Sequence, residues 1–329
     1  MNKMLGSVLS SIYRGALTVS QVSYRVVPLS IRKVGARVIS VGNITWGGTG
    51  KTPLVVSLAR EIAHAGKKVA VLTRGYGKDE ALLLERKLKP IPVIVDPDRV
   101  AAGRRAVEEF QADLLLLDDG YQQWRVKKDL EILMVDASAP FGNGRLIPRG
   151  TLREPMGEAA RADVIVVTKT EDSEQIPHLE SRIREFNSKA PIFFSRHRPS
   201  RLTCWPTGED ISLECLKNEK VCTLAGIADP RQFESTVRRL SAWIVLKYRV
   251  RDHHSYTAGE LIRLFTRCQR NGIRRIVTTE KDAVRIPRML LDATGSDFKG
   301  LELWVLEIRL EFLSDESIFL HRIDSLFSR

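Results

Sequence analysis

The sequence predicts an α/β protein in which helices flank a parallel sheet and a smaller second α/β lobe follows the first. Three observations support this fold class. Short apolar runs alternate with helix-length segments from residue 37 onward. A glycine-rich segment at residues 45–52 separates the first apolar run from the first of these helices. A stretch rich in proline and glycine at residues 145–160 interrupts the alternation, which then resumes.

The predicted strands are continuous apolar runs, which is typical of a parallel sheet buried on both faces. They are Val38–Val41, Val69–Thr73, Pro92–Val95, Leu114–Leu117, Ile132–Val135, Val164–Val167, Ile192–Phe194, Val221–Leu224, Ile276–Thr278 and Leu303–Leu306. Helices are predicted at Pro53–His64, which has proline in its first turn, at Val100–Phe110 and at Asp315–Ser328. The domains expected are an N-terminal helical region (1–30), a core (31–150) that residues 315–329 rejoin, and a second lobe (151–314).

Composition points to anionic partners. The 329 residues carry a net charge of +12, and no Asp or Glu precedes Glu61. Such a basic surface favours phosphorylated ligands, nucleic acid or an anionic membrane. The four cysteines form no C-x-x-C pair, so we expect reduced thiols and no zinc site. No apolar run is long enough to span a bilayer, and no signal peptide is evident.

Residues 4–27 are predicted to form one or two amphipathic helices. Apolar side chains recur at helical spacing, at Leu5, Val8, Leu9, Ile12, Tyr13, Ala16 and Val19. Two interpretations stay open from the pattern alone. The helix packs on the protein's own core, or it lies in a membrane interface with Arg14 and Arg25 near the lipid head groups.

The strongest chemical signal is a strand, a glycine-rich loop and a helix in succession. The loop reads Thr45-Trp46-Gly47-Gly48-Thr49-Gly50-Lys51-Thr52. Its glycines let several backbone N–H groups face one phosphate, and the start of the helix adds its dipole. Lys51 can contact the outer phosphates, and the Thr52 hydroxyl can bind Mg²⁺. The general pattern has glycine where this chain has Thr45, but the structural context favours a nucleoside triphosphate site over a simple turn.

A second signal is the acidic pair Asp118-Asp119, which directly follows the apolar run 114–117. Acidic residues at the carboxyl end of a buried parallel strand lie where open α/β sheets bind ligands. In a phosphate-loop protein this is the place for an acid that holds magnesium. The alternative is an ordinary turn after the strand, which Asp and Gly also favour.

Other polar segments are weaker alone. They are Arg74-Gly-Tyr76-Gly77, Asp79-Glu80, Asp252-His253-His254 and, in the expected hinge, Arg153-Glu154. A GTPase would read guanine with [NT]-K-x-D, and Thr168-Lys169-Thr170-Glu171 has Glu in the Asp position. No helicase or DNA-reading motif is present, so we expect no nucleic-acid partner.

Taken together, several segments resemble the tetraacyldisaccharide 4'-kinases of lipid A synthesis. In order along the chain they are Val41-Gly-Asn-Ile-Thr-Trp-Gly-Gly-Thr-Gly-Lys-Thr-Pro53, Arg74-Gly-Tyr-Gly77, Asp118-Asp-Gly-Tyr-Gln122, Phe141-Gly-Asn143, Leu152-Arg-Glu-Pro155, Ala225-Gly-Ile227, Asp252-His253 and Thr279-Glu-Lys-Asp282. The resemblance implies a P-loop NTPase core with a second lobe hinged beside it. It also implies transfer of the ATP γ-phosphate to the 4'-hydroxyl of an acylated glucosamine disaccharide.

The resemblance implies roles for single residues. Thr45 to Thr52 would hold ATP, with Lys51 acting on the phosphates during catalysis. Mg²⁺ would be held by Thr52, Asp118, Asp119 and Glu154. Asp79 would act as the base, coupled to His253. Arg74, Tyr76, Glu80 and Arg153 would complete the site.

Two departures from the family pattern are visible. The spacer that family members have between Arg-Gly-Tyr-Gly and the segment bearing the base is nearly absent here. Gln123 also replaces a histidine that is common in the family.

The resemblance further implies a peripheral enzyme on the cytoplasmic face of the bacterial inner membrane. Its partners would be the acylated disaccharide lipid and an anionic membrane surface, with no obligate protein partner. These implications favour the interfacial interpretation of residues 4–27. The alternative function is a membrane-associated NTPase or GTPase switch, which a nucleotide-preference assay would separate from a kinase.

Overall fold

The computed structural model describes residues 9–15, 17–19, 23, 31–75, 78–286, 300–313 and 316–327. The chain forms two compact units. The first comprises residues 1–76, 84–197 and 310–329, and the second comprises residues 77–83 and 198–309.

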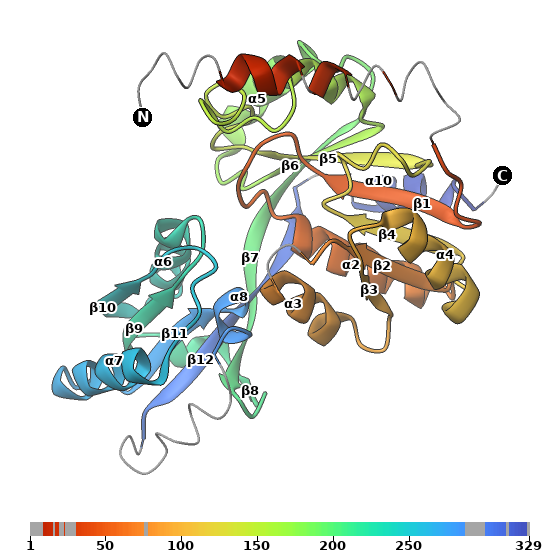
Figure 1. The fold of residues 1–329 in the computed structure, drawn as a ribbon. Helices are drawn as coiled ribbons and strands as arrows, with labels where there is room; N and C mark the ends of the chain where they lie inside the picture. The colour runs from red at the N-terminus through yellow and green to blue at the C-terminus, as the bar shows by residue number, and fades with distance from the viewer. Residues whose placement is uncertain are drawn as a thin grey trace. The chain divides into compact units, whose positions relative to one another are not determined.

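The first unit is built on a parallel sheet with the strand order β7-β6-β5-β1-β4-β2-β3 (Figure 1). Its strands are β1 (Arg37–Gly42), β2 (Val69–Thr73), β3 (Val93–Val95), β4 (Leu114–Asp118), β5 (Leu130–Asp136), β6 (Val164–Thr168) and the beginning of β7 (Ile192–Trp205). Strands β2, β4 and β6 are buried along their whole length, so the expectation of a two-sided parallel sheet is confirmed.

Helices cover both faces of this sheet. On one face, α2 (Lys51–His64), the later part of α3 (Lys78–Leu88) and α10 (Glu316–Asp324) share a core with β1, β4 and β5. On the other face, α4 (Arg99–Phe110) packs on β4 and β2, and α5 (Ile176–Arg184) packs on β5 and β6. The C-terminal helix α10 lies in the first unit, where Phe319 and Ile323 are buried.

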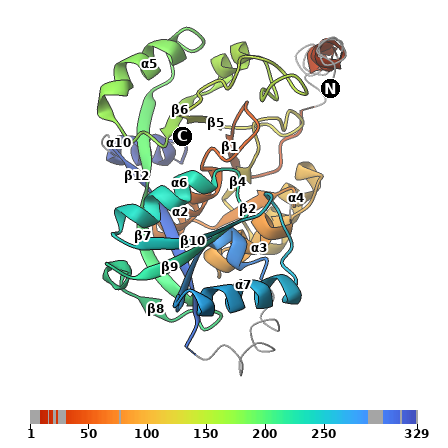
Figure 2. The same cartoon turned by 90° about the vertical axis from the view of Figure 1, so that its left-hand side faces the viewer.

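The second unit has a smaller sheet with the parallel order β10-β9-β11-β12, to which part of β7 adds, and β8 pairs antiparallel with β7. Its strands are β8 (Asp210–Ile211), β9 (Lys220–Ala225), β10 (Trp243–Arg249), β11 (Arg275–Thr279) and β12 (Glu302–Phe312). Helices α6 (Pro230–Arg239) and α7 (Ala258–Arg270) lie on opposite faces of β9 and β10 (Figure 2), and α8 (Glu280–Ala283) follows β11.

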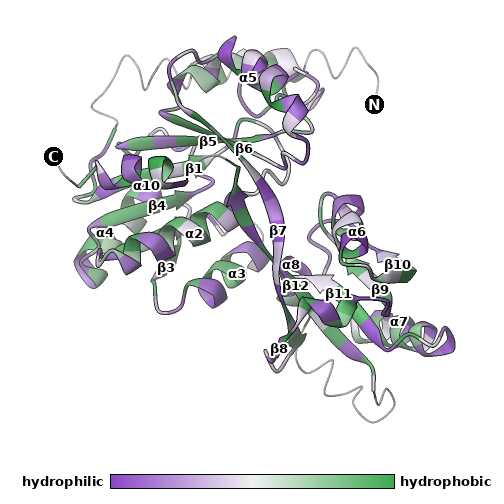
Figure 3. Cartoon of the chain, turned by 180° about the vertical axis from the view of Figure 1, so that it is seen from behind, coloured by the Kyte–Doolittle hydropathy of each residue, from purple (hydrophilic) through white to green (hydrophobic). Residues whose placement is uncertain are grey.

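The predicted boundary at residue 150 is wrong. Residues 145–160 lie within the first unit, because β6 and β7 continue the same parallel sheet beyond them. The chain passes into the second unit along β7, whose apolar start at Ile192–Phe194 gives way to a polar stretch from Ser195 to Arg201. Figure 3 shows this change of hydropathy along the strand. A proline- and glycine-rich stretch therefore marked a loop of one unit, while the boundary lies within a strand.

The N-terminal helical residues are described in part. Tyr13 and Leu17 pack on the core of the first unit. The Tyr13 hydroxyl donates to the carbonyl of Arg153 at 2.9 Å, and the Ser10 hydroxyl donates to that of Leu146 at 3.1 Å. The side of the segment that carries these residues therefore packs on the protein's own core, as the first of the two interpretations predicts. None of the described helices is long and apolar enough to cross a membrane.

Candidate active site

The glycine-rich loop lies between β1 and α2, as the sequence predicts. Gly50 precedes α2 in the left-handed region, at φ 78° and ψ 25°, and no side chain caps the helix. The first N–H groups of α2 are therefore directed at the loop with no side-chain acceptor at the cap, which is the arrangement that binds phosphate at a helix start. A Cβ on Gly50 would lie 2.7 Å from Nε2 of His197, so both the backbone angle and the space require glycine.

Buried hydrogen bonds hold the loop in shape. Asn43 is fully buried, and its amide donates to the Thr49 hydroxyl at 3.0 Å. Its side-chain oxygen accepts from Lys51 Nζ at 3.3 Å. From the end of β6, the Thr168 hydroxyl donates to the carbonyl of Thr49 at 2.9 Å. These contacts tie the loop to the ends of β1 and β6 and so fix its shape.

The rest of the loop leads toward residues 151–153. Thr45 forms an isolated bridge with Leu152, and the Trp46 amide donates to the carbonyl of Thr151 at 2.5 Å. The Trp46 side chain is 61% exposed, whereas Thr52, at the start of α2, is buried. Thr45, the departure from the general pattern, therefore has a structural use as an extended residue beside Leu152.

Asp119 lies beside the two cations expected at the phosphates. It forms an ion pair with Lys51 at 3.4 Å and accepts from Arg153 at 2.8 and 3.0 Å. Burial alone raises the pKa of Asp119, but the charges of Lys51 and Arg153 outweigh burial and lower it to about 2. The loop, the acidic pair and Arg153 are thus brought together at one edge of the sheet.

Asp118 lies deeper, at the end of β4. It is 3% exposed and accepts a hydrogen bond from the Thr73 hydroxyl at 3.4 Å. Arg99 at the start of α4 is also buried, and burial lowers its pKa to about 10 although Asp118 and Asp119 oppose this shift. Among the described residues, no group of three His, Cys, Asp or Glu side chains is arranged to hold a metal. Protein acids alone therefore do not complete a metal site in this part of the chain.

Glu154 does not fit its expected role as a metal ligand. It is fully buried, and its carboxylate accepts from Gln122 at 3.2 Å, Trp124 at 3.3 Å and Arg161 at 2.9 Å. The Arg161 guanidinium in turn stacks on the rings of Tyr121 and Trp124, at 3.8 and 4.3 Å from their centroids. A metal would have to displace these donors, so Glu154 instead ties the Asp-Asp-Gly-Tyr-Gln segment to the segment that carries Arg153.

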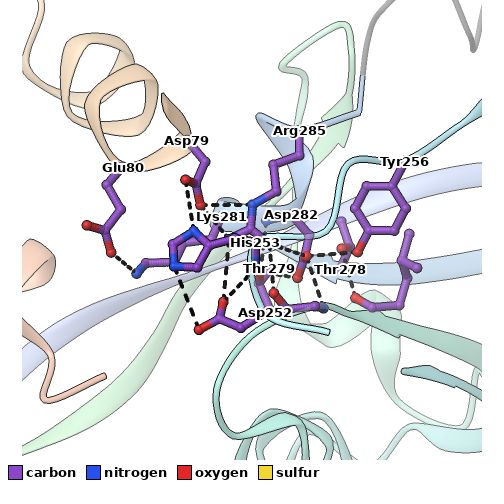
Figure 4. A network of polar contacts seen from close by, with 12 residues as sticks. Asp79, Glu80, Asp252, His253, Tyr256, Thr278, Thr279, Lys281, Asp282 and Arg285 are labelled. Carbon is purple, nitrogen blue, oxygen red and sulfur yellow. Dashed lines mark hydrogen bonds and ion pairs between the residues drawn. The ribbon is translucent and has the colours of Figure 1, made fainter. Parts of the chain in front are cut away.

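A second polar cluster lies in the other compact unit (Figure 4). Asp79 at the start of α3 is 6% exposed, and its Oδ1 lies 3.1 Å from Nδ1 of His253. Arg285 donates to Asp79 Oδ2 through Nε at 2.8 Å and also through Nη2. Glu80 accepts from Lys281 at 2.7 Å. The residues that the resemblance names as base and partner are therefore hydrogen-bonded neighbours, although 174 positions separate them.

The remaining predicted residues give less information. Arg74 is exposed directly after β2. Tyr76 lies outside the described residues. Lys169, from the segment that resembles a guanine-reading motif, forms an ion pair with Asp136 at 2.5 Å.

His197 on β7 is a site residue that the sequence did not reveal. Burial, with a further effect of Lys169, lowers its pKa from 6.5 to about 4. The unfolded chain therefore binds a proton first, and we expect the free energy of unfolding to fall by roughly 2–3 kcal/mol as the pH drops from about 6.5 to about 4. Chemical denaturation across this range checks the slope. His197→Asn should flatten it and exposed His64→Gln should not, whereas equal slopes for all three proteins would contradict the prediction.

With this geometry in place, comparison with known proteins identifies the family. The family model described as tetraacyldisaccharide-1-P 4'-kinase matches residues 2–79 and 78–328. The chain belongs to this family. The two matched segments meet at residues 78–79, which is where the sequence shows the shortened spacer.

Relatives in the family cover most of the chain. A tetraacyldisaccharide 4'-kinase of Anaeromyxobacter dehalogenans (strain 2CP-C) is 37% identical over 291 residues, 81% of this chain and 77% of the relative. Another, of Syntrophus aciditrophicus (strain SB), is 35% identical over 334 residues, 92% of this chain and 89% of the relative.

A solved structure agrees with this assignment. It is the "apo" form of LpxK from Aquifex aeolicus in complex with ATP, with a TM-score of 0.72 at 25% identity. The match covers 96% of this chain and 97% of that one. This member of the family is therefore a P-loop kinase, and the alternative of a GTPase switch is not favoured.

Proposed function

We propose that this kinase transfers the γ-phosphate of ATP to the 4'-hydroxyl of a tetraacyldisaccharide 1-phosphate in lipid A biosynthesis. The observation that carries the proposal is the Asp79–His253 pair at 3.1 Å. A phosphate loop alone serves any nucleotide hydrolase, whereas an alcohol acceptor also needs a group that takes its proton.

The bonds that change follow from phosphoryl transfer. The acceptor oxygen forms a bond to the γ-phosphorus, and the bond from that phosphorus to the bridging oxygen of ADP breaks. The electron pair of the broken bond stays on ADP, and the acceptor proton passes to the Asp79–His253 pair. Lys51 and Arg153, both held by Asp119, supply positive charge for the phosphates. The residues from Thr45 to Thr52 hold the triphosphate.

Magnesium fits the donors offered by Thr52 at the start of α2 and by Asp118 at the end of β4. The Thr52 hydroxyl and the Asp118 carboxylate are hard oxygen donors, the kind that Mg²⁺ prefers. Mg²⁺ usually keeps several waters and takes its remaining ligands from substrate phosphates, so a site with few protein acids is in keeping with it. Bound there, the ion would neutralise charge on the β- and γ-phosphates. We assign Asp119 to orienting Lys51 and Arg153, because both cations already contact it.

We also propose that the enzyme is peripheral, on the cytoplasmic face of the inner membrane. Leu9, Ile12 and Val19 are 39%, 63% and 72% exposed, and they give the N-terminal helical segment an exposed apolar face. This apolar face and the basic, acid-free sequence around it suit an anionic lipid surface.

The activity is tested with purified full-length protein, ATP, Mg²⁺ and the tetraacyldisaccharide 1-phosphate in detergent. We expect a product phosphorylated at the 4' position, and its loss when EDTA removes the metal. Mass spectrometry of the lipid checks both results. Strong preference for GTP with no phosphorylated lipid would instead support a switch protein.

The membrane proposal is tested by placing charge on the exposed face. The double variant Ile12→Asp/Val19→Asp should bind anionic liposomes at least roughly tenfold more weakly, because two apolar contacts are lost and two negative charges gained. Ile318→Asp is the matched control, since Ile318 is also an exposed apolar residue, 61% exposed, on a helix of the same unit. Equal co-sedimentation of the double variant and the wild type would argue against this face.

A further inference from the structure

Arg285 makes more contacts than its place after a short helix would suggest. Its side chain is 6% exposed. Besides Asp79, it donates through Nη1 to the carbonyl of Gly226 at 2.7 Å and to Asp282 Oδ1 at 3.3 Å. Asp282 is itself fully buried and accepts from the Tyr256 hydroxyl at 2.8 Å and from the Gly226 amide at 3.0 Å. These contacts hold Nη1 of Arg285 in place, so that Nε and Nη2 of the same guanidinium face Asp79.

The two oxygens of Asp79 have different partners. Oδ2 faces Nε and Nη2 of Arg285, and Oδ1 faces Nδ1 of His253. Burial alone raises the pKa of Asp79, but the hydrogen bonds and charge of Arg285, with a smaller effect of His253, lower it below its ordinary value. An ionised carboxylate only accepts hydrogen bonds, so Nδ1 must be the donating nitrogen of the imidazole.

The other ring nitrogen of His253, Nε2, has no hydrogen bond among the contacts of the described residues. Nε2 lies 3.9 Å from Asp252 Oδ2, beyond hydrogen-bond distance, and the His253 side chain is 44% exposed. We propose that Arg285 is a positioning residue that holds Asp79 as an oriented anion against His253, so that the Asp79–His253 pair can take the acceptor proton. This inference rests on the proposed function. In the step, the O–H bond of the acceptor breaks and its proton moves to the Asp79–His253 pair, while the electron pair stays on the acceptor oxygen, which forms the bond to phosphorus.

Other charged groups near the Asp79–His253 pair are themselves close to groups of opposite charge. Asp252 lies 3.7 Å from Arg285, and Lys281 forms an ion pair with Glu80 on the first turn of α3. Of these groups, only Arg285 and His253 donate a hydrogen bond to Asp79 among the contacts of the described residues. Removing Arg285 should therefore act chiefly through Asp79.

The experiment compares Arg285→Gln, Arg285→Lys and wild type in the full-length protein, with kcat and KM measured from acidic to alkaline pH. Arg285→Gln should lower kcat on the order of 10- to 100-fold and leave the KM for ATP unchanged. The acid limb of its kcat profile should move up by about one pH unit, because Asp79 then protonates more readily. Arg285→Lys keeps the charge and should recover part of kcat and of the acid limb.

A double-mutant cycle decides whether Arg285 acts through Asp79. In an Asp79→Asn background, Arg285→Gln should cost almost nothing further. An equal loss in both backgrounds, or an acid limb that stays in place, would overturn the proposal. Arg201→Gln is the matched control, because Arg201 also pairs with two carboxylates of the same unit. Absence of product from the wild type would instead refute the proposed function, so the two failures are distinguishable.

Discussion

Replacing Asp79 with asparagine is expected to lower kcat on the order of 10²- to 10⁴-fold while the KM for ATP stays near the wild-type value. Asparagine keeps the size of the side chain but removes the negative charge of the carboxylate that Arg285 and His253 both contact. Without that charge, the pair formed with His253 can neither take the acceptor proton nor be held in place by the ion pair with Arg285. ATP binding depends on the loop at residues 45–52, which contains none of these groups.

Steady-state kinetics with both substrates checks this result, and a thermal melt confirms that the variant is folded. Asp210→Asn is a suitable control, because Asp210 is also paired with an arginine of the second unit but is 71% exposed. Near-normal turnover in Asp79→Asn would mean that the shortened spacer has led to the wrong residue and that the base lies elsewhere.

Replacing Gly50 with alanine is expected to abolish useful ATP binding and to lower the Tm. At φ 78° an alanine costs about 1–2 kcal/mol of backbone strain. Its Cβ would also lie 2.7 Å from Nε2 of His197, so either the ring or the loop must move. The strain alone corresponds to about a tenfold loss of affinity if the loop rearranges, and displacement of the N–H groups that face the phosphates adds to it.

Isothermal titration with ATP and Mg²⁺ checks the affinity, and calorimetry checks the Tm. Gly157→Ala is the matched control, because a Cβ there meets nothing within 4 Å and its φ is not in the left-handed region. The double variant Gly50→Ala/His197→Ala separates the two causes. It should restore the part of the loss that comes from the close contact and leave the part that comes from φ. Wild-type affinity in Gly50→Ala would show that the loop tolerates a side chain there.

The sequence predicted the parallel sheets well because continuous apolar strands leave few alternatives. Each strand expected between residues 38 and 306 overlaps a strand of the structure, although Pro92 precedes β3, which begins at Val93. The helix at 51–64 begins two residues earlier than Pro53. The division of the chain was harder to predict. Proline and glycine at 145–160 indicate a loop equally well inside or between domains, and the strand that enters the second unit carries no such mark.

The site residues divide in the same way. Some lie in contiguous motifs that the sequence reveals, and others are isolated residues that only folding brings to the site. The glycine-rich loop and the acidic pair were readable because each is contiguous and follows a buried strand. Asn43 could also have been noticed, since it directly follows the first strand within the segment that resembles the family. His197 and Arg285 gave no such signal, because an isolated histidine or arginine in a polar stretch is ordinarily solvated.

What the sequence by itself determined is therefore the fold class, the phosphate loop from Thr45 to Thr52 and the family, since all three rest on patterns of neighbouring residues. The tertiary structure alone decided which distant groups share a hydrogen bond. It placed His253 and Arg285 on opposite oxygens of Asp79, and it enclosed Glu154 among Gln122, Trp124 and Arg161. The physical reason is that a carboxylate's role depends on which donors and charges surround it, and folding alone brings those together.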